Sequence, residues 1–168
     1  VVLGFYDDPA RPIRYQRVPL DSRFSQSGYV KKLMGQYQEG LKALGLEGLG
    51  VSVVPYPGRE LLGRFVGSKE CESCHEESYK VWKKSGHAKA WQTLVENDPP
   101  RNFDPECISC HVVGWSPQNY RPFQSGYLSE EKTPHLVKVG CETCHGPGEK
   151  HVKAEMGSDF ELQEKLRA

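Results

Sequence analysis

The sequence lacks any long hydrophobic run and carries no excess charge of either sign. A membrane-spanning helix needs about 18 consecutive apolar residues, so no membrane span is expected within this chain. Lys and Arg together number 22, as do Asp and Glu. This balance argues against nucleic acid as a partner, because nucleic-acid binders usually carry a basic excess. Only 37% of the 168 residues are apolar, which is little for a core built from side chains alone.

Cysteine and histidine are both absent from residues 1–66, so this segment lacks the side chains that usually bind haem iron. VVLGF and IRYQRV predict short strands on either side of the turn DDPARP, and GVSVV predicts a third. A helix is predicted from Ser27 to a stop at Gly45, with one apolar stripe, formed by Val30, Leu33, Met34, Tyr37, Leu41 and Leu44. The stability of so small an α/β segment is marginal by itself, and the segment is expected to dock on the rest of the chain or on another subunit.

The six cysteines are confined to three short motifs, CESCH, CISCH and CETCH. C-x-x-C-H is the attachment signature of c-type haem. Two thiols at this spacing can form thioethers with one porphyrin, and the adjacent histidine can bind its iron. The sequence therefore predicts three c-type haems. The thioether cysteines are Cys71, Cys74, Cys107, Cys110, Cys141 and Cys144, and the proximal iron ligands are His75, His111 and His145.

Other uses of cysteine fit this pattern less well. Two C-x-x-C pairs make one tetrahedral zinc site, so a third pair would be left over. A thioredoxin-like dithiol normally occurs once, in a β-α-β context. A disulfide framework would not require a histidine after every pair.

Three further histidines, His87, His135 and His151, lie outside the motifs. Three irons have six axial positions, which equals the number of histidines, so bis-histidine ligation of every haem is predicted. His87 shares a predicted helix face with Trp91 and Leu94. Gly146-Pro147-Gly148 predicts a tight turn that brings His151 back towards a haem. His135 follows Pro134 in a loop, and its assignment rests on the match between six histidines and six axial positions.

The predicted organisation has a boundary near residue 66. Residues 1–66 form the haem-free α/β segment, and residues 67–168 form a trihaem domain. The expected fold class is mainly α with extensive loops around covalent haems, with helices at 76–84 and 86–96 and loops over 97–140. Tyr79, Trp82, Trp91, Trp115 and Phe123 are available to pack on the porphyrins, although each is equally suited to an ordinary core.

Residues 67–151 resemble the multihaem cytochromes of the cytochrome c-554 family. The resemblance is carried by GSKECESCHEESYKVWKKSGHAKAWQTL, CISCHVVGW and GCETCHGPGEKH. It implies haem attachment by the motif residues, distal ligation by His87 and His151, and electron relay in the periplasm or outside the cell. The best-known members have four motifs, whereas this chain has three.

Residues 1–45, including GFYDDPARPIRYQRVPLD and YVKKLMGQYQEGLKALG, resemble the end of a calcineurin-like metallophosphatase or 5′-nucleotidase domain. The Asp, His and Asn metal motifs of a phosphatase are absent from the sequence, so no phosphatase activity is expected. The resemblance implies that this chain is the cytochrome end of a longer precursor cut near Val1.

Two function classes follow. The first is an electron carrier that serves redox partner proteins or an extracellular acceptor, with all irons six-coordinate and no catalytic residue. The second is a multihaem oxidoreductase with one open iron, acting on a small nitrogen or sulfur species. Six histidines for six positions favour the carrier. A homo-oligomer, with a haem-stacked filament as one form of it, and a periplasmic or extracellular location are also expected.

Overall fold

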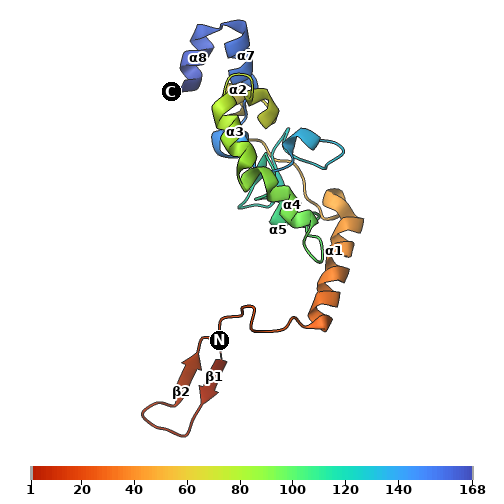
Figure 1. Cartoon of the computed structure of the whole chain (residues 1–168), viewed down its shortest axis with the longest axis vertical. Helices are drawn as coiled ribbons and strands as arrows, with labels where there is room; N and C mark the ends of the chain where they lie inside the picture. The colour runs from red at the N-terminus through yellow and green to blue at the C-terminus, as the bar shows by residue number, and fades with distance from the viewer. Residues whose placement is uncertain (1, 168) are drawn as a thin grey trace. The chain divides into compact units, whose positions relative to one another are not determined.

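The computed structural model describes residues 2–167, and the chain divides into two compact units, Val1–Leu33 and Met34–Ala168. The helical and strand segments follow one another as β1 Val2–Phe5, β2 Ile13–Gln16, α1 Gly28–Gly48, α2 Arg59–Leu62, η1 Ser68–Cys71, α3 Glu76–Lys84, η2 His87–Lys89, α4 Ala90–Val95, α5 Pro105–Ile108, β3 Trp115–Ser116, β4 Arg121–Pro122, η3 Pro134–Leu136, α6 Cys141–His145, α7 Glu149–Gly157 and α8 Phe160–Arg167. Here η denotes a 3₁₀-helix. The chain is mainly α with long loops, which confirms the expected fold class (Figure 1).

The N-terminal unit contains an antiparallel hairpin, drawn as the two arrows in Figure 1. Both strands form where the sequence predicts them, and the turn between them is closed by a hydrogen bond from the Tyr6 amide to the Pro12 carbonyl of 2.9 Å. One face of the hairpin is wholly apolar, because side chains alternate along a strand. Its exposed residues are Leu3, Phe5, Ile13 and Tyr15.

Helix α1 follows the apolar stripe expected from the sequence and is interrupted at the expected glycine. Gly45 has φ 60° and ψ −178°, which lies outside the helical region. The stripe itself is mostly uncovered: Leu41 is buried, whereas Leu33, Tyr37 and Leu44 are each more than half exposed. From Met34 onward the helix belongs to the second unit, where the buried Gln38 side chain donates a hydrogen bond to Asp104.

The apolar core of the second unit lies around the second motif rather than evenly among the three. Its buried members are Phe65, Trp91, Leu94, Ile108, Val112, Val113, Trp115, Tyr127 and Leu136. Two tryptophans that the sequence offered for packing on porphyrins are therefore core residues, as the ordinary interpretation of each allowed. The Trp115 indole donates to the Tyr127 carbonyl at 2.7 Å, and Trp91 packs against the Tyr127 ring.

One predicted strand is much shorter in the structure. The strand predicted over GVSVV reduces to a single β-bridge between Val54 and Phe123, since Pro55 has no amide hydrogen with which to extend the pairing. The compact units divide after Leu33, and the boundary between haem-free and haem-binding residues near residue 66 stays a prediction. Residues 34–66 group with the motifs because side chains such as Phe65 enter the same core.

Candidate functional site

Each of the three motifs forms one short helical turn. In the first, η1 ends at Cys71 and the His75 amide donates to the Cys71 carbonyl at 2.9 Å, just before α3 begins. In the third, α6 spans the whole motif, Cys141–His145. A helical turn places residues three and four positions apart on one face. The two thiols and the histidine of a motif can therefore address a single ligand.

The second motif is anchored by helix capping and by the core. The Asp104 carboxylate caps α5 by accepting from the Glu106 amide, and Pro105 occupies the first turn, as both residue types favour. The middle residue Ile108 is buried in the apolar core. Nδ1 of His111 lies 2.6 Å from the Ala90 carbonyl oxygen. A carbonyl can only accept, so Nδ1 carries the proton and Nε2 keeps its lone pair when the ring is neutral.

The rings of His75 and His151 lie close together although 76 positions separate them in the chain. Their ring centres are 6.2 Å apart, and the ring planes differ by 26°. Two imidazoles bound to opposite sides of one metal ion through bonds of about 2 Å would hold their ring centres about 6 Å apart. The observed separation fits an iron held between a motif histidine and His151 of α7.

The first and third motifs meet at their leading cysteines. Burial, reinforced by the neighbouring Cys141 thiol, raises the pKa of the Cys71 thiol to about 12. Burial also raises the pKa of the Cys107 thiol. The Cys141 amide donates to the Ser68 hydroxyl at 3.0 Å, which joins η1 to α6. Two of the three candidate attachment points are therefore adjacent.

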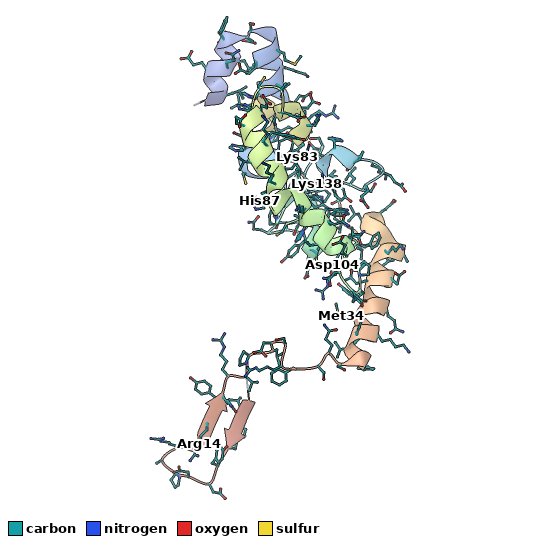
Figure 2. The ribbon with its side chains drawn as sticks, in the orientation of Figure 1. Arg14, Met34, Lys83, His87, Asp104 and Lys138 are labelled. Atoms are coloured by element: carbon teal, nitrogen blue, oxygen red, sulfur yellow. The ribbon has the colours of Figure 1, made fainter. Side chains whose placement is uncertain are left out.

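His87 and His135 lie on two short 3₁₀-helices of the second unit. His87, labelled in Figure 2, begins η2, and its carbonyl accepts from the Val139 amide just before the third motif. His135 lies in η3 against the backbone of Gly67, where an added Cβ would be 2.7 Å from the His135 carbonyl oxygen. Both imidazoles are exposed on the polypeptide, so a ligand can reach either of them.

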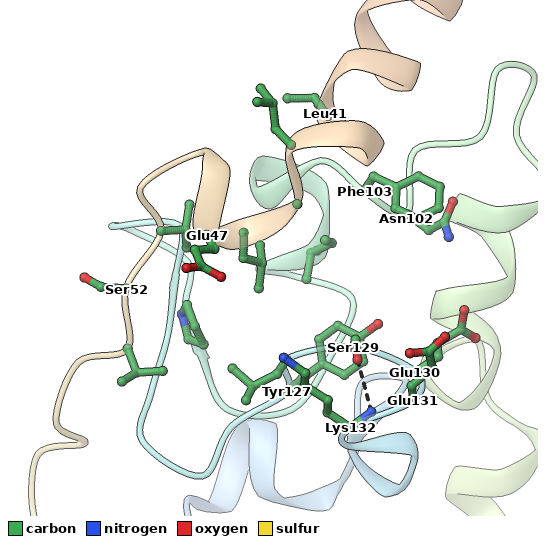
Figure 3. A pocket seen from close by; sticks show the side chains of 18 of the residues that line it. Leu41, Glu47, Ser52, Asn102, Phe103, Tyr127, Ser129, Glu130, Glu131 and Lys132 are labelled. Carbon is green, nitrogen blue, oxygen red and sulfur yellow. Dashed lines mark hydrogen bonds between the residues drawn. The ribbon is translucent and has the colours of Figure 1, made fainter.

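A separate groove lies among α1, the Phe103 loop and residues 127–132. It encloses about 760 Å³, and its lining is mostly apolar but includes the charged residues Glu47, Glu130, Glu131 and Lys132 (Figure 3). The dashed line in Figure 3 marks the hydrogen bond from the Lys132 amide to the Ser129 hydroxyl. No cysteine or histidine is among its lining residues, although Ile108 of the second motif contributes to its wall.

Comparison with known proteins finds a family model that matches the segment with the motifs. Residues 70–146 match the family described as "Cytochrome c554 and c-prime". This segment is that of a c-type cytochrome. It contains all three motifs, so covalently bound c-type haem is implied for the cytochrome segment, residues 70–146. The donor set fits that cofactor, since the segment supplies paired thiols together with a histidine whose Nε2 is free to bind iron.

The curated relative and the solved structure both come from Nitrosomonas europaea. Cytochrome c-554 is 38% identical over 97 residues, which cover 50% of this chain and 39% of the relative. The reduced state of cytochrome c554 is 32% identical, covers 60% of this chain and 52% of that chain, and gives a TM-score of 0.46. The chain thus spans about two fifths of the length of the curated relative.

The helices were also compared with the length and hydropathy that a membrane span requires. Among the helices of residues 2–167, none is both long enough and apolar enough to cross a membrane. The resemblance of residues 1–45 to the end of a metallophosphatase domain stays a prediction.

Two contacts made by motif residues could not be predicted from the sequence. The Ala90 carbonyl that orients His111 is a backbone group, and no residue type in the sequence signals it. Glu142 in CETCH is buried and bound to backbone amides, whereas Glu72 at the same place in CESCH pairs with Lys69. Identical residues at identical motif positions thus have different surroundings, which only the fold distinguishes.

Proposed function

We propose that this chain is an extracytoplasmic electron carrier with three covalently bound c-type haems, each held by two histidines. The cysteines of the motifs would form the thioethers, and His75, His111 and His145 would be the proximal ligands. His87, His135 and His151 would be the distal ligands. The observation that carries the proposal is the 6.2 Å separation of the His75 and His151 rings.

The proximity of His75 and His151 supports bis-histidine ligation because it brings a motif histidine next to a non-motif histidine. One iron would take His75 and His151, and the remaining two irons would share His87 and His135 as partners of His111 and His145. The protonated Nδ1 of His111, fixed by the Ala90 carbonyl, orients its ring and increases the basicity of Nε2. No iron then has an open position for a substrate, which favours a carrier over an oxidoreductase.

The chain's own residues suit the relay of electrons. A c-type haem, when bound, supplies an iron that changes between the ferric and ferrous states. The adjacency of Cys71 and Cys141 brings two attachment points together. Two imidazoles per iron favour lower potentials than a His/Met pair, since methionine raises the potential.

The setting of the chain is part of the proposal. Covalent haem attachment takes place outside the cytoplasmic membrane in the family that the chain resembles, which supports a periplasmic or extracellular location. The partners would be redox proteins or an extracellular electron acceptor. Self-association, up to a filament, is supported by the exposed apolar hairpin face, where Phe5 and Tyr15 are 80% and 78% exposed.

Haem content and axial ligation test the proposal directly. The intact mass of the purified protein is expected to exceed the 19.0 kDa polypeptide by three haems, and acid–acetone should leave the colour with the protein. Carbon monoxide added to the reduced protein is expected to leave the Soret band unchanged. A mass with fewer than three haems would contradict the stoichiometry, and a Soret shift in the native protein would favour the oxidoreductase.

A further inference from the structure

Glu142, the residue that follows the first cysteine of the third motif, is a buried carboxylate. It is only 4% exposed. Burying a charged group away from water is costly unless hydrogen bonds replace its hydration. The bonds that Glu142 accepts come from backbone amides in two other segments of the chain.

The two carboxylate oxygens join three parts of the haem-binding region. Oε2 accepts from the Gly67 amide at 2.7 Å and from the Val66 amide at 3.2 Å. Oε1 accepts from the Gly148 amide at 2.7 Å and from the Val66 amide at 3.0 Å. Residues 66–67 precede η1 and the first motif, whereas Gly148 immediately precedes α7, which carries His151. One side chain of the third motif therefore connects the segment before the first motif, which contains His75, with the start of α7, which contains His151.

A second glutamate connects the same two segments. The Arg64 amide donates to Glu149 Oε2 at 3.0 Å, and the Glu149 amide donates to the Arg64 carbonyl at 3.2 Å. The Glu149 side chain is 22% exposed, and its hydrogen bond with Lys153 lowers the pKa of its carboxyl group. Water competes more easily for the exposed contact between Arg64 and Glu149 than for the bonds of the buried Glu142.

We propose that Glu142 is the positioning residue that sets His151 opposite His75. This inference rests on the proposed function, in which these two rings bind one iron. Glu142 fixes the chain three residues before His151 and, at the same time, the chain leading into Cys71. Because hydrogen bonds to a charged acceptor are short and strong, the carboxylate sets the 6.2 Å spacing of the two rings. It does so without touching the iron.

Glutamine at this position provides a near-isosteric test. An amide nitrogen donates and cannot accept, so Glu142→Gln loses either the Gly148 bond or the Gly67 bond, whereas the Val66 amide, which contacts both oxygens, keeps one acceptor. Glu72→Gln is the matched control, because Glu72 occupies the same place in the first motif and pairs with the exposed Lys69. His151→Ala is the benchmark for an iron that has lost its distal ligand.

The measurements are haem content by intact mass, the Soret change on adding carbon monoxide to the reduced protein, and the high-spin ferric signal in electron paramagnetic resonance. We expect Glu142→Gln to keep three haems. One of the three irons should lose its distal ligand and bind carbon monoxide, as in His151→Ala. Glu72→Gln is expected to match the native protein. Adding Glu142→Gln to His151→Ala should open no further iron, since both changes act on the same one.

The outcomes separate this inference from the function on which it rests. If His151→Ala binds no carbon monoxide, the pairing of His75 with His151 is wrong, and the proposed function loses its main support. If His151→Ala opens an iron but Glu142→Gln behaves like Glu72→Gln, only the positioning role is overturned. Loss of all three haems in Glu142→Gln would overturn that role as well, because it would make Glu142 a general folding residue.

Discussion

At the residue scale, burial decides what each polar or titratable group can do. Tyr127 illustrates this point outside the haem-binding motifs. It is 4% exposed in the core, and burial, aided by the nearby Glu130 charge, raises the pKa of its hydroxyl group above the usual value near 10. The folded chain therefore holds this proton more tightly than the unfolded chain does.

The expected result is a loss of stability at alkaline pH that depends on Tyr127. A raised pKa stabilises the fold fully below about pH 10, and that contribution is lost as the pH rises above this value. Urea unfolding of the native protein and Tyr127→Phe, followed by circular dichroism at pH 9 and pH 11, measures the effect. The native protein should lose more free energy of unfolding between the two pH values than Tyr127→Phe. Equal losses would show that another group titrates.

At the element scale, short segments are held by close backbone approach more than by regular secondary structure. The loop from Gly114 to Tyr127 is an example. The Phe123 amide donates to the Gly114 carbonyl at 2.8 Å, and the Tyr127 amide donates to the Val113 carbonyl at 3.0 Å. A Cβ on Gly126 would collide with the Gly114 carbonyl oxygen. Only glycine allows the two strands of this loop to approach so closely.

Gly126→Ala is accordingly expected to destabilise the protein by about 1–3 kcal/mol, the usual cost of forcing extra volume into a packed site. Gly40→Ala is the matched control, because Gly40 lies within α1 and an added Cβ there has no neighbour within 4 Å. That change should stabilise by about 0.5–1 kcal/mol, through helix propensity. Chemical unfolding measures both. A neutral Gly126→Ala would show that the loop can open without cost.

At the scale of the whole molecule, an exposed segment of the N-terminal unit separates the β1–β2 hairpin from α1. Residues 17–27 have no regular secondary structure, and every side chain except the partly buried Val18 is exposed. All cysteines and histidines lie beyond this segment. The N-terminal unit therefore contributes no haem ligand of the usual kinds.

Limited trypsin digestion is expected to cut first after Arg17 or Arg23, since exposed irregular segments are the preferred sites of proteolysis. The larger fragment should keep all the covalent haem and its unchanged spectrum. Mass spectrometry of the early fragments identifies the site, and a variant with both arginines changed to glutamine should resist the first cut. Initial cleavage within α3 or α7 would contradict the exposure of residues 17–27.

The sequence by itself determined the cofactor chemistry, because C-x-x-C-H places two thiols and a ligand within one turn of chain. It also indicated the β1–β2 hairpin, the stop of α1 at Gly45 and the helices α3 and α4, since each depends on local periodicity or turn residues. The tertiary structure alone brought His151 opposite His75 and buried Glu142 while leaving Glu72 near the surface. Contacts between segments more than 70 residues apart depend on how the core packs, and local sequence patterns do not predict that packing.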